Sequence, residues 1–131
     1  MIFVDTGAWF AIFVPDDPDH TAARAWLDTN PQPLLTTDYI IDETLTLLTA
    51  RGQRPRAIQA GVRLFSEELA TVHFVSGTDI ASAWDVFRGF TDKNWSFTDC
   101  TSKVVMGALG ITTAFSFDQH FRQFGNVTVV P

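Results

Sequence analysis

Short apolar runs alternate with helical segments along the whole chain, and this alternation constrains the fold more than any other feature of the sequence. Helices are expected to begin at capping residues or prolines and to end at glycine or proline. The predicted strands span residues 1–5, 34–37, 71–75, 111–116 and 127–130, and the predicted helices span 8–14, 18–30, 38–51, 55–68, 78–90 and 96–110. This pattern predicts an α/β fold, with a central parallel sheet of four to five short strands flanked by helices on both faces.

The bulk properties fit one globular domain spanning residues 1–131. The chain is 46% hydrophobic and 18% charged, which is typical of a folded protein. No apolar run approaches the roughly 20 residues that cross a bilayer, and no targeting segment is expected before the first strand. The single Cys100 excludes an internal disulfide and fits a reducing compartment, so we expect a cytoplasmic protein without membrane association. In the helix after Pro55, we expect Ile58, Val62 and Phe65 to face the core.

Four carboxylates fall at comparable places in this pattern. Asp5 directly follows the first predicted strand, and Asp118 follows the fourth. Glu43 lies at the edge of the apolar arc of the third predicted helix, and Asp99 lies in the first turn of the last one. Ligands of open parallel sheets bind outside the carboxyl ends of the strands, so all four acids can converge on one edge. Because clustered carboxylates repel one another, the set points to a divalent cation that prefers oxygen ligands, Mg²⁺ or Mn²⁺.

Each of these acids also has an ordinary structural role open to it. Asp5 could cap the helix that follows it, and Glu43 could pair with an arginine. Asp99 follows Ser96 at the spacing of a capping box, and it could pair with Lys103 one turn later. The sequence alone leaves these alternatives open.

Four segments, in this order, resemble the PIN-domain ribonucleases, and within them the VapC-type toxins of bacterial and archaeal toxin–antitoxin pairs. The segments are Ile2-Phe-Val-Asp5-Thr6, Thr36-Thr37 followed by Glu43, Ser96-Phe-Thr-Asp99, and Phe115-Ser-Phe-Asp118-Gln-His-Phe121 with Gly125. The resemblance covers essentially the whole chain and implies a PIN-like domain with an acidic cleft. One departure is Gly7, where many members have Ser or another small residue, and we expect little effect on catalysis.

The resemblance implies a metal-dependent endoribonuclease that hydrolyses phosphodiester bonds. By position, the three recurrent metal-binding acids of the family resemble Asp5, Glu43 and Asp99 of this chain. The more variable fourth acid of the family resembles Asp118. Thr6 matches the small hydroxyl residue that helps to hold the site, and Ser96 supports the last helix. In the implied mechanism Mg²⁺ or Mn²⁺ polarises the scissile phosphate, and Asp118 orients the attacking water. The presence of all four acids argues against a non-catalytic member.

The substrate implied by the resemblance is single-stranded RNA, either tRNA or mRNA. A net charge of −6 argues against extensive electrostatic binding of nucleic acid over the whole surface. However, the chain has no acid between Glu43 and Glu67, and this basic segment contains the candidate RNA contacts Arg51, Arg54 and Arg56. A solvated helix face is the alternative explanation of the segment.

The resemblance also implies a small antitoxin protein that blocks the cleft, and a homodimer. The apolar helix 8–14 together with Trp26 is the candidate surface for the antitoxin, with plain core packing as the alternative.

Other functions remain open to a chain of this kind. It could be a non-catalytic PIN-like module that binds nucleic acid or protein, or an RNA-processing PIN nuclease without an antitoxin. A phosphatase with Asp5 as nucleophile usually has a second acid two residues later, where this chain has Gly7, and a late lysine, for which Lys103 is the only candidate. A cysteine-dependent hydrolase would need Cys100 beside one of the three histidines, and nothing in the sequence places one there.

Overall fold

The computed structural model describes residues 1–131 and contains a five-stranded sheet in which every neighbouring pair of strands is parallel. The strands are β1 (Ile2–Val4), β2 (Leu34–Thr37), β3 (Thr71–His73), β4 (Thr113–Phe115) and β5 (Thr128–Val130). Their order across the sheet is β3-β2-β1-β4-β5. The predicted fold class, a PIN-like parallel sheet of four to five short strands with flanking helices, is confirmed. None of the helices combines the length and apolar character needed to cross a bilayer.

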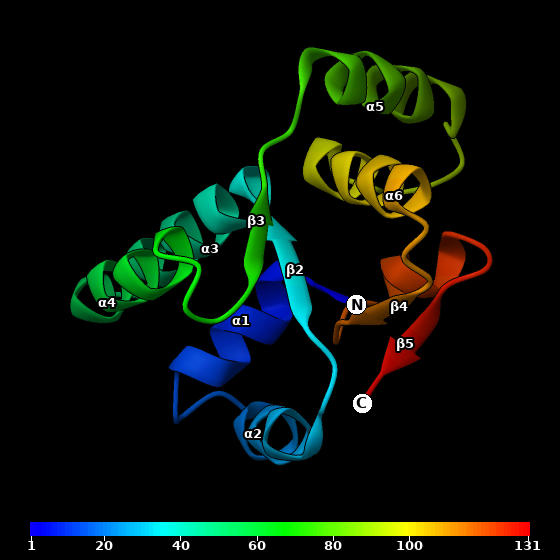
Figure 1. Ribbon diagram of the computed structural model, residues 1–131. Helices are drawn as coiled ribbons and strands as arrows, with labels where there is room; N and C mark the ends of the chain where they lie inside the picture. The colour runs from blue at the N-terminus through cyan, green and yellow to red at the C-terminus, as the bar shows by residue number, and fades with distance from the viewer.

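The central strand is β1, and the direction of the chain across the sheet reverses there. The helices α1 (Thr6–Phe13), α2 (His20–Thr29), α3 (Asp38–Ala50) and α4 (Arg54–Phe65) carry the chain from β1 through β2 to β3. The helices α5 (Gly77–Gly89) and α6 (Phe97–Leu109) return it to β4, and the 3₁₀ helix η1 (Gln119–Gln123) leads to β5. Figure 1 shows the α3–α4 pair and the α5–α6 pair on either side of the strands.

This topology fixes where a ligand is expected. Because crossovers between parallel strands are right-handed, connections that run in opposite directions across a sheet cover opposite faces. The strand order changes direction between β1 and β4, which pair through Phe3 and Ala114. The carboxyl ends of these two strands therefore form a topological switch point, where open α/β sheets bind their ligands.

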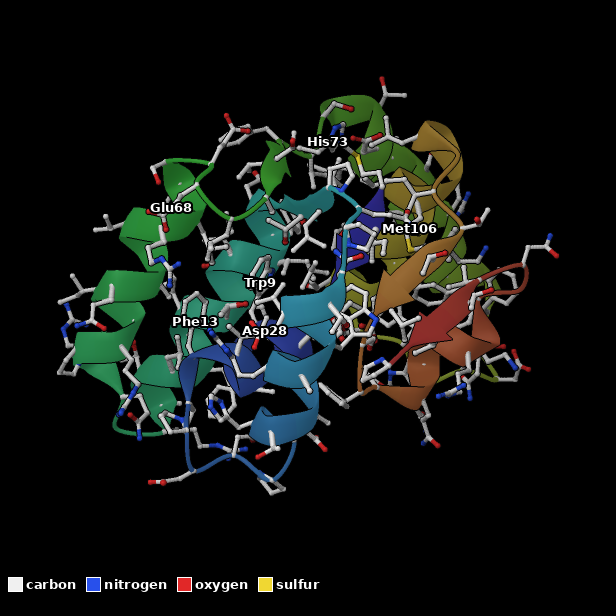
Figure 2. All side chains as sticks on the ribbon, turned by 60° about the horizontal axis from the view of Figure 1, so that its bottom comes forward. Trp9, Phe13, Asp28, Glu68, His73 and Met106 are labelled. Atoms are coloured by element: carbon white, nitrogen blue, oxygen red, sulfur yellow. The ribbon has the colours of Figure 1, made fainter.

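An aromatic core surrounds the first strand and the first helix. Phe3, Trp9 and Phe121 are fully buried. Trp9 stacks on Phe13 with ring centroids 6.1 Å apart, and Figure 2 shows both side chains in the middle of the molecule. The indole N–H of Trp9 donates to the hydroxyl of Thr36 over 3.2 Å, so burial leaves this polar group satisfied.

The apolar character of α1 is explained by core packing. Six of its eight residues are buried, which is why it is apolar on nearly every side. Trp26 of α2 packs on Phe115 of β4 with ring centroids 4.3 Å apart. The helix 8–14 is therefore mainly interior and Trp26 is half-buried, so together they supply little of the exposed surface expected for an antitoxin.

The helix α4 turns a different side to the core from the one expected. Ile58, Val62 and Phe65 are 60%, 66% and 54% exposed, so the prediction that they face inward is wrong. The buried side consists of two alanines and a leucine: Ala57, Ala60 and Leu64. A Cβ atom on Gly61 would lie 3.6 Å from the Leu45 side chain, so small residues let α4 pack closely against α3.

Local hydrogen bonds set the beginnings of two helices. The helix α2 begins two residues later than expected, because the carboxylate of Asp17 accepts from the N–H of Asp19 (3.0 Å) and closes a turn. The helix α5 begins after Ser76 and not at Thr78. Ser76 and Asp79 form a complete capping box, which satisfies two free N–H groups at once.

Candidate metal centre

Asp5 links the carboxyl ends of β1 and β4. It occupies the N-cap position of α1, but its side chain makes no capping hydrogen bond. Its backbone N–H donates to the carbonyl of Phe115 (3.1 Å), and its carboxylate accepts from the hydroxyl of Ser116 (3.0 Å). Ser116 Oγ in turn accepts from the backbone N–H of Asp118 (3.0 Å). One buried hydroxyl therefore connects the first and the last of the four candidate acids.

The carboxylate of Asp5 is held in an environment that disfavours its charge. Asp5 is only 4% exposed, and burial raises its pKa from 3.8 to about 7. The negative charges of Asp99 and Asp118 act in the same direction, whereas the hydrogen bond from Ser116 opposes the shift. No lysine or arginine forms an ion pair with Asp5, so its negative charge has no cationic partner within the chain.

Asp99 combines a capping role with a free oxygen. Its Oδ2 accepts from the N–H of Ser96, and its own N–H donates to Ser96 Oγ, each over 3.0 Å, so the capping box is present. Asp99 does not form the alternative ion pair with Lys103, and its side-chain partner is His120. The second oxygen, Oδ1, takes part in no hydrogen bond. This oxygen therefore keeps its lone pairs available for a ligand.

Glu43 is held by the hydroxyl group that the resemblance singled out. The Thr6 hydroxyl donates to Glu43 Oε1 over 2.6 Å, and this contact joins the first turn of α1 to α3. No arginine pairs with Glu43, so the structural alternative suggested for it is wrong. Glu43 is half-buried, while the adjacent Asp42 is exposed, as the helical periodicity predicts.

Asp118 and His120 complete the group. Asp118 caps η1, because its Oδ1 accepts from the backbone N–H of His120 (2.9 Å). The ring nitrogen Nδ1 of His120 lies 3.0 Å from Asp99 Oδ2 and 3.5 Å from Asp118 Oδ2. One ligand atom from each of Asp99, Asp118 and His120 lies within 4.8 Å of the others. Asp5 and Glu43 lie outside this inner group, and Asp5 is coupled to it through Ser116 and through charge.

These residues fit a divalent cation. The group offers carboxylate oxygens and one imidazole nitrogen, and none of its acids is neutralised by a lysine or arginine. A buried acid with a raised pKa beside two further acids is the arrangement that a bound cation relieves. The resemblance to PIN nucleases implies a divalent metal ion, and the donors present here suit such an ion.

Sequence reasoning missed two members of the site. Ser116 and His120 stood inside a quoted segment but were not assigned to the centre. No local periodicity indicates the role of Ser116, because its contact with Asp5 joins residues 111 positions apart. For His120, its position two residues after a candidate acid was the only available signal.

The three candidate RNA-binding arginines lie at the far end of α3 and at the start of α4. Arg51 follows the last residue of α3, about 12 Å along the helix axis from Glu43. Its guanidinium lies 5.8 Å from the centre of the Phe10 ring, and Arg56 donates to Gln53 Oε1 over 2.6 Å. All three arginines are exposed, and their contact with RNA stays a prediction.

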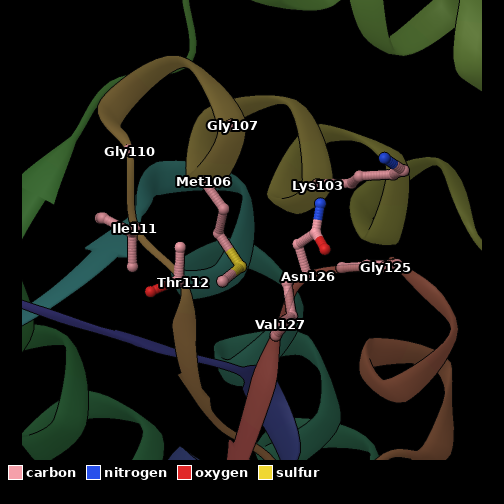
Figure 3. Close-up of a pocket in the computed structure, with 10 residues that line it drawn as sticks. Lys103, Met106, Gly107, Gly110, Ile111, Thr112, Gly125, Asn126 and Val127 are labelled. Atoms are coloured by element: carbon pink, nitrogen blue, oxygen red, sulfur yellow. The ribbon is translucent and has the colours of Figure 1, made fainter.

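A separate depression of about 280 Å³ lies at the opposite edge of the sheet. Figure 3 shows the residues before β4 and β5 that line it, among them Thr112 and Asn126, with Lys103 and Met106 of α6. Because these segments precede their strands, the depression faces away from the carboxyl edge. Lys103 is therefore unavailable as the lysine of a phosphatase centred on Asp5.

The thiol of Cys100 has no features of a nucleophile. Cys100 is fully buried, and burial raises the pKa of its thiol, with the charge of Asp99 adding to the effect. Among the histidines, His120 contacts Asp99 and Asp118 instead. The structure gives no support to a cysteine-dependent hydrolase.

Comparisons with known proteins agree with this arrangement. The sequence matches the PIN domain family over residues 2–127. It is 36% identical over 133 residues to the 23S rRNA-specific endonuclease VapC20 of Mycobacterium tuberculosis, and the match covers 100% of this chain and 99% of that protein. The crystal structure of M. tuberculosis VapC20, a Sarcin-Ricin loop cleaving toxin, superposes with a TM-score of 0.91 at 32% identity over 100% of both chains.

A more distant structure has the same fold. FitAcB from Neisseria gonorrhoeae superposes with a TM-score of 0.73 at 15% identity, covering 100% of this chain and 97% of that one. The family profile and the close relative both span nearly the whole of the chain. The chain therefore belongs to the PIN domain family and, within it, to the VapC-type toxins.

Proposed function

We propose that this chain is a divalent-metal-dependent endoribonuclease, formed by one PIN domain over residues 1–131, and the toxin component of a toxin–antitoxin pair. Its membership of the VapC-type toxins supports cleavage of RNA within the strand. The observation that carries the proposal is the Asp99–Asp118–His120 group beside the buried Asp5, at the switch point of the sheet.

The proposed roles combine the assignments that the resemblance implies with the contacts of each acid. Asp5, Asp99 and Glu43 would hold Mg²⁺ or Mn²⁺, with Asp118 as the fourth acid, and the bound ion would offset negative charge on the scissile phosphate. The Thr6 hydroxyl keeps Glu43 oriented toward the start of α1. Asp118 is 38% exposed in its side chain and is therefore the acid best placed to orient the attacking water.

The proposed substrate is a single-stranded stretch or loop of RNA. The expected tRNA and mRNA remain candidates, and the likeness to an enzyme specific for 23S rRNA adds ribosomal RNA as the first substrate to test. Arg51, Arg54 and Arg56 are proposed to steer the phosphates. Replacing all three with Ala should weaken RNA binding and flatten its salt dependence, whereas unchanged binding would remove them from the proposal.

The proposed partners are a small antitoxin and a second copy of the chain, in the cytoplasm. Two exposed apolar faces are available to them. One lies on α4, with Ile58, Val62 and Phe65, and the other on α5, with Trp84 and Phe87, whose rings stack 6.0 Å apart. Faces of this kind on a small protein indicate contact surfaces.

The experiment that tests the function is cleavage of 23S rRNA, tRNA and a mixed-sequence single-stranded RNA by the purified chain. Each reaction is run with Mn²⁺, with Mg²⁺ and with EDTA. We expect cleavage that requires the metal and is lost in Asp99→Asn, and that persists in the matched control Asp42→Asn, which changes an exposed acid.

The possible results separate the proposal from its rivals. Cleavage that survives both EDTA and Asp99→Asn would refute the proposed centre. A chain that cleaves none of the three RNAs and does not bind Mn²⁺ in calorimetry would instead be a non-catalytic binding module. Cleavage by a chain whose neighbouring gene encodes no binding partner would favour an RNA-processing nuclease without an antitoxin.

A further inference from the structure

The imidazole of His120 occupies the position between two of the candidate metal-binding acids. Its Nδ1 lies 3.0 Å from Asp99 Oδ2 and 3.5 Å from Asp118 Oδ2. Both distances allow one ion to contact the nitrogen and the two carboxylates after small shifts, since the three ligand atoms already lie within 4.8 Å of one another. His20 and His73 have other partners, the carbonyl of Ala11 and the carboxylate of Asp79.

The ring is held in this position by its neighbours. The backbone N–H of His120 donates to Asp118 Oδ1 over 2.9 Å, which fixes the start of η1 against the candidate centre. The next residue, Phe121, is fully buried and packs against Phe3 and Phe124 with ring centroids 6.0 and 4.7 Å apart. With its side chain only 24% exposed, His120 is part of the built site and does not swing freely in solvent.

We infer that His120 Nδ1 is a direct nitrogen ligand of the metal ion and biases this centre toward Mn²⁺ over Mg²⁺. The inference rests on the proposed metal-dependent function and adds a ligand to the acids assigned from the resemblance. Mg²⁺ strongly prefers oxygen ligands, while imidazole is a good ligand for first-row transition metals. Replacing one oxygen donor by a nitrogen therefore costs Mg²⁺ more affinity than it costs Mn²⁺.

A competing role for the same ring is that of a hydrogen-bond donor to the two acids. In that case His120 would hydrogen-bond to Asp99 and Asp118 only in the metal-free protein, and the ion would displace it. The two roles predict opposite results when the imidazole is removed, because a displaced donor competes with the metal whereas a ligand assists it.

The experiment is pulsed electron paramagnetic resonance of Mn²⁺ bound to the full chain, which detects nitrogen nuclei coordinated to the ion. We expect a nitrogen modulation in the wild-type protein that disappears in His120→Asn and persists in the matched control His73→Asn. Wild-type protein labelled with ¹⁵N only at histidine provides a measurement that needs no mutation. The modulation from this sample should have the frequency of ¹⁵N, because the label is confined to the nitrogens of the three histidines.

Calorimetric titration supplies the second readout. His120→Asn should lower Mn²⁺ affinity by about 10- to 100-fold and Mg²⁺ affinity by much less, so the ratio of the two affinities should fall. Bound Mn²⁺ without nitrogen modulation, or tighter Mn²⁺ binding in His120→Asn, would overturn the inference and leave the proposed nuclease intact. A wild-type protein that binds no Mn²⁺ would overturn both.

Discussion

The buried carboxylate of Asp5 should make the metal-free protein less stable as the pH rises. Its pKa is raised from 3.8 to about 7 in the folded chain. Between these values the folded state keeps the proton and the unfolded state has lost it. The free energy of unfolding therefore falls across this window and becomes level above about pH 7, where both states are ionised. A difference of roughly 3 pKa units, at about 1.4 kcal/mol each, corresponds to about 4 kcal/mol.

The variant Asp5→Asn removes this ionisation. In EDTA at about pH 8 we expect it to be more stable than the wild-type protein by up to about 4 kcal/mol, less whatever the amide loses in its contact with Ser116. The stability difference between variant and wild type should shrink by about 1.4 kcal/mol per pH unit as the pH falls from about 7 to about 4. A mutation that removes a candidate metal ligand would thus stabilise the empty fold.

Urea unfolding followed by the fluorescence of the four tryptophans measures this difference at each pH. Asp42→Asn, on an exposed acid, is the control and should change stability by less than about 0.5 kcal/mol. A difference between Asp5→Asn and wild type that stays constant with pH would refute the reasoning, as would an Asp5→Asn variant that is less stable at about pH 8. Added Mn²⁺ should stabilise the wild type and have little effect on this variant.

Three further predictions test other parts of the structure. Ser96→Ala and Ser76→Ala each remove the cap of a helix and should cost about 1 kcal/mol in urea unfolding, but only Ser96→Ala should slow RNA cleavage. Equal cleavage rates in the two variants would show that the cap of α6 does not contribute to the activity of the candidate centre. Leu64→Ala should lower the free energy of unfolding by about 2–5 kcal/mol, whereas Val62→Ser on the exposed side of α4 should change it by less than about 0.5 kcal/mol. Comparable losses in the two variants would indicate that Val62 faces the core after all. Thr6→Val should slow cleavage about tenfold, because it removes the hydrogen bond that holds Glu43, whereas Thr6→Ser should preserve the rate. An unchanged rate in Thr6→Val would show that this hydrogen bond has no catalytic consequence.

The sheet could be predicted from the sequence because its signals are local. Each strand is a short apolar run, and each long helix has a recognisable beginning or end, such as the capping box at Ser96. The position of Asp5 at the carboxyl end of a strand, together with the alternation of elements, was enough to place it at the ligand-binding edge. The partial burial of Glu43 also followed from helical periodicity.

The orientation of α4 and two members of the candidate centre could not be predicted in this way. The apolar residues of α4 lie on more than one side, and close packing through Ala60 and Gly61 decides which side faces α3. Ser116 and His120 join the site only because β1 lies beside β4 and η1 folds back onto α6. Such contacts depend on tertiary structure, and the only local signal was the position of His120 two residues after Asp118.

The pairing of β1 with β4 has a consequence for the newly made protein. The strand β1 needs, as its neighbour, a strand that begins at Thr113 and that therefore leaves the ribosome only after β2, β3 and the helices α1 to α6 have been made. Contacts over such separations form slowly, and only after most of the polypeptide is present. A fragment that ends before this strand has Asp5 and Asp99 but lacks Ser116 and the acid at position 118. Because Asp118 is one of the proposed metal-binding acids, we expect such a fragment to be unable to cleave RNA, so that activity appears only after β4 and η1 have been made.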